Sequence, residues 1–161
     1  MTTIYLSLGS NIGDRAGNIA RAVAALASHG VRVTRQSSLY ETEPVDFLDQ
    51  DWFLNAVVEA ETDLTPPKVM EALLQIERAL GRERLVPKGP RLLDMDILLF
   101  GAGIVRTPEL EIPHPRMATR RFVLVPFNEI APGAEHPVLH KTIAQLLAQT
   151  PDRSEVRLFP A

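Results

Sequence analysis

Two aspartates separated by a single residue are the clearest chemical feature of this sequence. Asp94 precedes, and Asp96 interrupts, the otherwise apolar run 95–100, which is typical of a buried strand. Alternate side chains of a strand share one face, so the two carboxylates point the same way, with Cα atoms about 6.6 Å apart. Their oxygens suit Mg²⁺, and a bound cation removes the penalty of burying two like charges. The alternative is a solvated strand start that carries two surface acids.

Basic side chains flank this pair, although the formal net charge of the whole chain is -3. They are Arg82, Arg84, Lys88, Arg91, Arg116, Arg120 and Arg121. Metal ions bridge the phosphates of a polyphosphate while guanidinium groups bind the remaining oxygens, so the combination indicates a nucleotide substrate. Any one arginine could instead be an ordinary solvated loop residue. His114, between two prolines, is either a turn residue or a further phosphate donor.

An aromatic ring and an amide share one face of another predicted strand. Period-two alternation places Phe53 and Asn55 on one face, and the opposite face is uniformly apolar. An amide both donates and accepts hydrogen bonds, so the pair could stack on a flat nitrogen heterocycle and read its edge. Asn55 could instead satisfy the backbone of a neighbouring loop.

The first hundred residues must supply the elements that position these groups. Their periodicity predicts strands at 4–8, 31–40, 53–62 and 95–100, the first ended by a turn at residues 9–11. Helices are predicted from a cap at Asp14 to about Ser28, and from Thr65-Pro66 to Leu80. This order predicts an α+β fold, a ferredoxin-like antiparallel sheet with helices packed on one face.

The rest of the chain is expected to form a surface loop and a C-terminal extension. Residues 82–90 combine basic residues with Gly and Pro, which predicts a mobile surface loop. Residues 112–115 are expected to be irregular, 122–126 are apolar, and 142–149 are expected to form a short last helix.

Length and composition limit the class of protein. With 161 residues, 45% of them hydrophobic, the chain is expected to fold as a single domain over residues 1–161. The negative charge provides no overall field for nucleic acid or an anionic membrane. No apolar segment reaches the roughly 20 residues that span a bilayer, and there are no cysteines. We therefore expect a cytoplasmic protein, and we expect it to be monomeric.

Six short segments, taken in order, resemble one enzyme family. They are G-S-N at 9–11, Y-E-T-E-P at 40–44, F-L-N-A at 53–56, G-P-R-L-L-D-M-D-I-L-L-F-G at 89–101, I-P-H-P-R-M at 112–117 and R-R-F-V-L-V-P at 120–126. Over roughly residues 2–150 the sequence is similar to 6-hydroxymethyl-7,8-dihydropterin pyrophosphokinases of folate biosynthesis. The resemblance implies a ferredoxin-like core and transfer of pyrophosphate from MgATP to the pterin hydroxymethyl group, with release of AMP.

The resemblance also implies roles for individual residues. Asp94 and Asp96 would hold two Mg²⁺ ions, and Arg82 and Arg91 would join them in catalysis. The ATP site would include Glu77, Arg84, Arg91, Ile97, His114 and Arg120. The pterin pocket would include Thr42, Pro44, Val45, Phe53, Asn55 and Phe122, with the two phenylalanines as the stacking pair. Lys88, Glu43 and Pro115 differ from the Trp, Pro and Tyr common in relatives.

Two other functions are compatible with single features of the sequence. In a phosphatase with a D-x-D nucleophile the apolar strand precedes the acids, whereas here it follows them. A ferredoxin-like RNA-binding module would need a basic surface and an aromatic-rich motif that this sequence lacks. Release of AMP from ATP, dependent on Mg²⁺ and the pterin, distinguishes the three. No residue is assigned as a general base.

Overall fold

The computed structural model describes residues 1–44, 51–80 and 92–160. In chain order the elements are β1 (Thr2–Ser10), α1 (Arg15–Ala27), β2 (Val31–Gln36), β3 (Leu39–Thr42), β4 (Phe53–Thr62), α2 (Pro66–Ala79), β5 (Asp94–Phe100), β6 (Val105–Arg106), β7 (Glu111–Ile112), the short 3-10 helix η1 (Met117–Thr119), α3 (Arg121–Ile130), α4 (Ile143–Gln149) and β8 (Val156–Phe159). The predicted order of strands and helices in the first hundred residues is confirmed, with one difference. The segment predicted as a single strand over 31–40 is divided into β2 and β3.

The division falls at Ser37, which is buried between the two strands. Its backbone N–H donates to the carbonyl of Val57 at 2.9 Å, and its Oγ accepts from the Val57 N–H at 3.0 Å. The Ser37 side chain therefore replaces a backbone acceptor, and this local competition interrupts the regular pairing.

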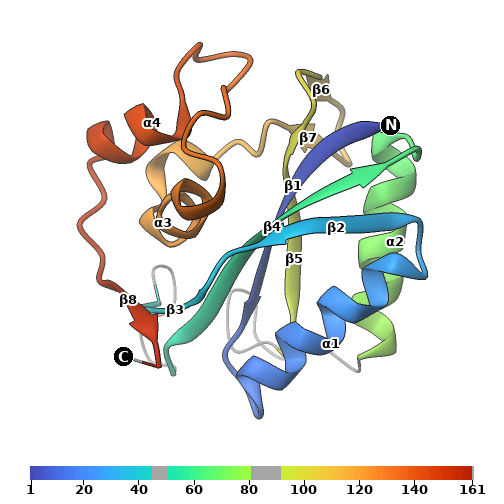
Figure 1. Cartoon of the computed structure of the whole chain (residues 1–161), viewed down its shortest axis with the longest axis horizontal. Coiled ribbons are helices and arrows are strands. Elements are labelled where there is room, and N and C mark those ends of the chain that lie inside the picture. The colour runs from blue at the N-terminus through green and yellow to red at the C-terminus, as the bar shows by residue number, and fades with distance from the viewer. Residues whose placement is uncertain (45–50, 81–91, 161) are drawn as a thin grey trace.

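The six-stranded sheet is built around β1. Its order is β5-β1-β4-β3-β8, with β2 also paired to β4, and each of these pairings is antiparallel (Figure 1). The strands β6 and β7 form a separate two-stranded ribbon. Because β1 lies between β4 and β5, it joins the strand that carries Asn55 to the strand that carries the two aspartates.

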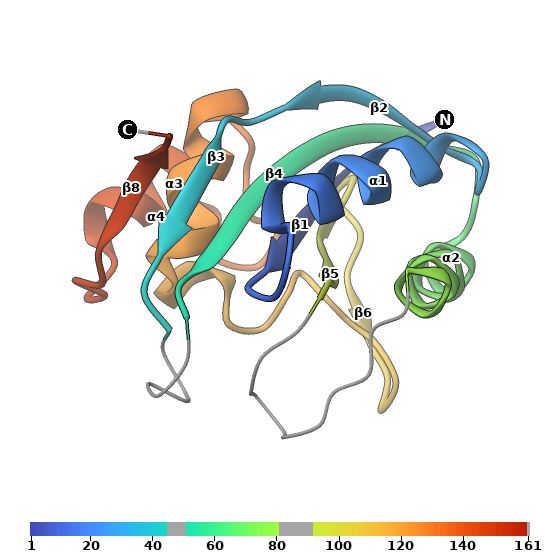
Figure 2. The same ribbon diagram turned by 90° about the horizontal axis from the view of Figure 1, so that it is seen from below.

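Helices α1 and α2 cover one face of this sheet. Asp14 begins α1, and its Oδ1 accepts a hydrogen bond from the N–H of Gly17 at 3.1 Å, as its position before the apolar stripe predicts. Thr65 and Pro66 begin α2, where proline at the first turn costs no backbone hydrogen bond. Figure 2 shows α1 inside the curve of β2 and β4.

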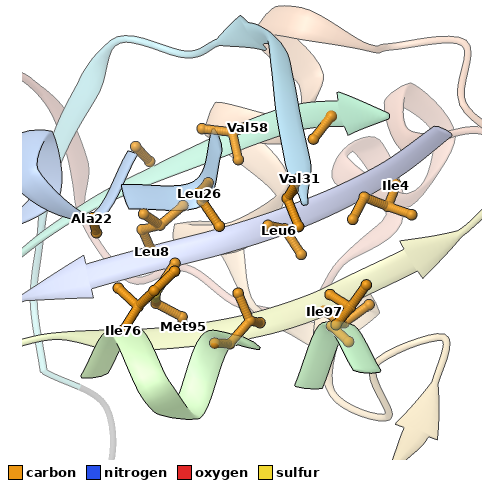
Figure 3. Close-up of a cluster of buried hydrophobic side chains, with 14 of the residues drawn as sticks. Ile4, Leu6, Leu8, Ala22, Leu26, Val31, Val58, Ile76, Met95 and Ile97 are labelled. Atoms are coloured by element: carbon orange, nitrogen blue, oxygen red, sulfur yellow. The ribbon is translucent and has the colours of Figure 1, made fainter. Parts of the chain in front are cut away.

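The core between these helices and the sheet is aliphatic. In Figure 3, Leu6 and Leu8 of β1 and Met95 of β5 point toward Leu26 of α1 and Ile76 of α2. These five side chains are at most 5% exposed, so each contributes about 1.5–3 kcal/mol of burial free energy. The alternation that turns them inward turns their strand neighbours, including both aspartates, to the other face.

Helices α3 and α4, which come after the first hundred residues, pack on that other face, whereas α1 and α2 both lie on one face, as predicted. Val57 of β4 and Leu99 of β5 belong to a second core with Val123 and Phe127 of α3 and Ile143 of α4. The apolar segment 122–126 is the first half of α3, which is helical despite Pro126. Proline removes one backbone hydrogen bond there, and the buried apolar face of α3 outweighs that loss.

Two elements complete the C-terminal part. The short helix expected at 142–149 is confirmed as α4, which begins with a capping box formed by Thr142 and Gln145. The strand β8 then pairs with β3 at the edge of the sheet. None of the helices in the described part of the chain is long and apolar enough to cross a membrane.

Candidate active site

The register of the sheet brings two of the predicted site residues to either side of Gly9. Gly9 of β1 is directly opposite Asn55 of β4 on one side and Asp94 of β5 on the other. Residues opposite each other in a sheet share a face, so the amide and the carboxylate lie in one row, about 10 Å apart across two strand spacings. Asp96 follows on the same face, opposite Ser7.

Gly9 is required here because of the space it leaves. A Cβ at this position would lie 2.6 Å from Oδ1 of Asn55, well inside van der Waals contact. The sequence predicted that residues 9–11 form a turn, but β1 continues through Ser10. Gly9 is therefore a strand residue whose missing side chain opens the surface between Asn55 and Asp94.

The acids of β5 line a cavity of about 710 Å³. It is enclosed by parts of α2, β5, the segment before β7 and the turn after it. Three further residues predicted for the nucleotide site belong to this lining: Glu77, Ile97 and His114. Its other walls are Met70, Leu73, Leu74, Met95, Pro108, Glu109, Leu110, Glu111 and Pro115. The structure therefore brings both aspartates and three predicted ATP residues into one cavity.

Glu77 connects α2 to the outer edge of the sheet. Its Oε2 accepts a hydrogen bond from the backbone N–H of Met95 at 2.8 Å. β5 is the last strand on that side of the sheet, and this carboxylate satisfies an edge N–H that a further strand would otherwise pair. Glu77 thus fixes the wall of the cavity next to Asp94 and Asp96.

His114 follows β7 and is held by backbone contacts. Its own N–H donates to the carbonyl of Leu98 at 3.0 Å, and its Nδ1 accepts from the N–H of Arg116 at 3.2 Å. Burial, followed by the charges of Arg120 and Arg116, lowers the pKa of His114 to about 4, against the opposing effect of Asp94. The imidazole is therefore neutral near pH 7, and with Nδ1 as acceptor its proton is on Nε2.

The carboxylate pair suits a magnesium ion that arrives with a nucleotide. No group of three or more His, Cys, Asp and Glu side chains within residues 1–44, 51–80 and 92–160 could hold a metal by itself. Mg²⁺ in phosphate-transfer sites usually takes one or two carboxylates and completes its coordination with substrate phosphates and water. Asp94 and Asp96, half-buried on one face, match that donor set.

On the other side of Gly9, a buried hydrogen bond orients Asn55. Its Nδ2 donates to Oγ1 of Thr42 at 2.6 Å, and both residues are buried. Thr42 lies on β3, directly opposite Phe53 of β4. Pro44, also buried, follows it. The partner of Asn55 is thus a side chain of the neighbouring strand, contrary to the alternative of a loop backbone.

Arg120 and Phe122 lie at the start of α3. The guanidinium carbon of Arg120 is 5.4 Å from the centroid of the Phe122 ring, within the range of a cation–π contact. Phe122 and Phe53 are both half-buried, and α3 packs against β4. Their stacking on a common ligand stays a prediction.

Four predicted site residues lie outside the described residues: Val45, Arg82, Arg84 and Arg91. The predicted mobile loop 82–90, with Lys88, also lies there. Conversely, sequence analysis assigned no site role to Gly9, predicted only as part of a turn, or to the cavity residues Met70, Glu109, Leu110 and Glu111. Their chain positions suggest no common site, because they come together only through α2, β1 and the segment before β7.

Comparison with known proteins identifies the same enzyme family that the sequence motifs resemble. The family model described as 7,8-dihydro-6-hydroxymethylpterin-pyrophosphokinase (HPPK) matches residues 5–132. The chain is 51% identical over 132 residues to the 2-amino-4-hydroxy-6-hydroxymethyldihydropteridine pyrophosphokinase of Bacillus subtilis strain 168, covering 81% of this chain and 79% of that enzyme. It is 39% identical over 157 residues to the folic acid synthesis protein fol1 of Pneumocystis carinii, covering 98% of this chain but 21% of that protein.

A solved structure shares the fold. It is the HPPK-DHPS triple mutant of Plasmodium falciparum with pteroate, matched with a TM-score of 0.73 and 18% sequence identity. The match covers 92% of this chain and 43% of that one. The chain therefore corresponds to one part of these longer proteins.

Proposed function

Because the chain belongs to the 7,8-dihydro-6-hydroxymethylpterin-pyrophosphokinase family, we propose that Asn55, Asp94 and Asp96 form the centre of its active site. The enzyme transfers pyrophosphate from ATP to the hydroxymethyl group of 6-hydroxymethyl-7,8-dihydropterin in folate biosynthesis, and AMP leaves. The observation that carries the assignment is the row Asn55–Gly9–Asp94. In this row an amide suited to reading a heterocycle lies across one residue from a carboxylate suited to a metal ion, and this supports the proposal of a site for both a pterin and a nucleotide.

The nucleotide occupies the cavity beside β5 in this proposal. Asp94 and Asp96 would hold two Mg²⁺ ions, which when bound neutralise charge on the transferring phosphates. Glu77 and Ile97 form the wall beneath the nucleotide, and Arg120 supplies positive charge. His114, neutral near pH 7, offers its Nε2–H to a phosphate oxygen as a hydrogen-bond donor without an added charge.

The pterin occupies the other end of the row, against Asn55. Thr42 accepts one N–H of the Asn55 amide at 2.6 Å, so the carbonyl oxygen and the second N–H can address the edge of the ring. Phe53 and Phe122 would stack on its two faces, and Pro44 would close the pocket beside β3. An oriented amide discriminates strongly against heterocycles with the wrong donor and acceptor pattern.

Positioning accounts for the catalysis that these residues can provide. The pterin hydroxyl oxygen attacks the β-phosphorus in line, the bond to the α-phosphate oxygen breaks, and AMP departs. The two sites lie on β4 and β5, the strands on either side of β1, so the reacting groups are held without large rearrangement of β1, β4 and β5. Arg82, Arg84, Arg91 and Val45 remain predictions, as do the monomeric state and the cytoplasmic location.

We also assign the first hundred residues to a ferredoxin-like core. The order β5-β1-β4-β2, with α1 and α2 on one face, supports a ferredoxin-like core made by the first hundred residues. In this description α3, α4 and β8 form a C-terminal extension, which adds a third layer and one edge strand.

The test combines product identification with one substitution. With ATP, Mg²⁺ and the pterin, the enzyme should release AMP and no ADP, and the variant Asn55→Ala should bind the pterin at least about tenfold more weakly. Its ATP affinity should stay within about twofold, because the amide lies across Gly9 from the metal-binding acids. Gln36→Ala, an exposed amide on β2, is the matched control. Equal loss of affinity for both ligands would contradict the assignment of Asn55.

A further inference from the structure

The last part of the chain contacts both sides of the proposed pterin pocket. The family match ends at residue 132, and residues 150–159, here called the C-terminal segment, lie beyond it. This segment runs from the end of α4 to the edge of the sheet, where β8 lies beside β3 (Figure 1). We propose that it is a positioning element, which holds the start of α3 and the end of β3 at the separation that the pterin requires.

The first contact is with the N-terminus of α3. Oδ2 of Asp152 accepts a hydrogen bond from the N–H of Arg121 at 2.8 Å, and Nε of Arg121 donates to the carbonyl of Ser154 at 3.1 Å. Oδ1 of Asp152 accepts from N–H and Oγ of Ser154 at 2.9 and 2.6 Å. An acid here also interacts favourably with the helix dipole. Arg121 stands between Arg120 and Phe122, so this cluster fixes the residues proposed to contact both substrates.

The second contact is with β3. Val156 of β8 is directly opposite Thr42, and the backbone N–H of Glu43 donates to the carbonyl of Glu155 at 3.3 Å. The N–H of Glu155 in turn donates to Oε1 of Glu43 at 2.7 Å. Thr42 is the residue whose hydroxyl orients Asn55, so β8 supports the edge from which the amide is held.

Ion pairs strengthen this edge. Nη2 and Nε of Arg157 donate to Oε1 of Glu41 at 2.8 and 3.1 Å, and Arg15 of α1 binds Oε2 of Glu41 at 2.9 Å. The guanidinium of Arg157 also lies 4.4 Å from the centroid of the Trp52 ring, next to Phe53. A charged group that contacts two neighbouring segments restricts both, although each exposed pair alone adds little stability.

These contacts predict a larger effect on the pterin than on the nucleotide, because Arg120 is, among the residues that the structure describes, the one proposed nucleotide residue that adjoins them. The contacts given above for the C-terminal segment involve α3, β3, Trp52 and Glu41, whereas the nucleotide cavity is lined by α2, β5 and residues 108–115. Loosening the segment should therefore move Thr42 and Phe122 while leaving Asp94 and Asp96 in place. Small displacements of positioning groups weaken binding without abolishing it.

The inference rests on the proposed pterin pocket. Measurements of ligand affinity distinguish a failure of the inference from a failure of the pocket assignment. The variants are Arg157→Ala and Asp152→Ala, with Arg157→Lys as the conservative form. The matched control is Arg32→Ala, which removes an exposed arginine paired with Glu61 at the far end of β4. Affinity for the pterin is measured by calorimetry with Mg²⁺ and saturating α,β-methylene-ATP, whose α–β bridge does not release AMP. Nucleotide affinity is measured separately, and thermal unfolding verifies folding.

We expect both alanine variants to bind the pterin about tenfold more weakly. Nucleotide affinity should change less than about twofold in Arg157→Ala, and in Asp152→Ala, which also loosens the neighbour of Arg120, it should fall by a smaller factor than pterin affinity does. Arg157→Lys should recover part of the loss, and Arg32→Ala should match the parent chain. If Asn55→Ala weakens pterin binding but Arg157→Ala and Asp152→Ala do not, the inference fails and the pocket stands. If Asn55→Ala also has no effect, the pocket itself is wrong.

Hydrogen exchange on the unaltered protein provides a second measurement if a variant does not fold. Pterin binding, with the nucleotide analogue already present, should slow exchange at the amides of Arg121, Glu43 and Glu155, because the segment and both walls become ordered together. Unchanged exchange at all three amides would overturn the inference.

Discussion

Replacing Gly9 with alanine tests the arrangement of the two sites most directly. The added Cβ would lie 2.6 Å from Oδ1 of Asn55, whereas ordinary contact begins near 3.4 Å. Both strands are central and well packed, so the Asn55 side chain is the group that must move. Its rotation breaks the hydrogen bond to Thr42 and turns the carbonyl oxygen away from the ligand.

The expected cost follows from these contacts. A lost intramolecular hydrogen bond costs about 0.5–1.5 kcal/mol and a strained side-chain torsion about as much again, for a total of about 1–3 kcal/mol. If the pterin reads Asn55 in its present orientation, Gly9→Ala should weaken pterin affinity by about 5- to 150-fold. Nucleotide affinity should stay within about twofold, since no heavy atom of Asp94 is among the three nearest the added methyl.

The assay is calorimetric titration of each ligand, with Gly133→Ala as the control. A Cβ at Gly133 would meet no atom within 4 Å, so this substitution adds the same methyl group without a steric consequence. Pterin affinity equal in Gly9→Ala and Gly133→Ala would refute the role of Asn55 as an oriented reader. A loss of nucleotide affinity alone would refute it equally.

Three other predictions concern the metal pair, the pH dependence of stability and the second core. Asp96→Ala should lower turnover at least about 10³-fold, equivalent to about 4 kcal/mol, and a near-normal steady-state rate would contradict its metal role. Burial, then the charge of His140, lowers the pKa of His136, whose Nδ1 accepts two backbone hydrogen bonds. Below its ordinary pKa of about 6.5 the unfolded chain therefore binds more protons, and stability falls as the pH decreases. His136→Gln should make this fall shallower in urea denaturation, and an unchanged slope would exclude His136 as its source. Phe127→Ala should cost about 3–5 kcal/mol of unfolding free energy, since the ring is fully buried against Tyr5; a change below about 1 kcal/mol would mean that the second core adapts freely.

Local chemistry explains which elements were predictable from the sequence. Asp14 before an apolar stripe, and Thr65 before Pro66, are sufficient to begin α1 and α2, because a helix start depends on neighbouring residues only. The alternation in β4 likewise depends on adjacent side chains. These segments were identified with nearly the observed bounds.

The C-terminal elements depend on distant partners. The sequence of α3 contains β-branched residues and Pro126, so its helical state follows from the face it buries against β4 and β5. The strand β8 has four residues, and its partner β3 lies more than a hundred residues earlier in the chain. Long-range pairing of so short a strand leaves no periodic pattern to read.

The site was predictable to the extent that it consists of single residue types with distinctive chemistry. The types and spacing of Asp94, Asp96 and Asn55 indicate candidate site residues directly. The role of Gly9 is to leave space for the side chain of Asn55, which lies opposite it on β4. Glu77 was expected at the nucleotide site, but its hydrogen bond to the Met95 backbone depends on β5 being an edge strand. Such roles become visible only once the register is known.

The placement of β1 between the two strands proposed to bind the substrates also restricts how this active site can change over evolutionary time. Sliding β4 or β5 by one residue would exchange every inward and outward side chain, so Asn55 or Asp94 would enter the aliphatic core. The spacing between the two substrates can therefore not drift gradually through backbone shifts. Adaptation to an altered pterin must come from substitutions at side chains around the pocket, in loops and in the C-terminal segment.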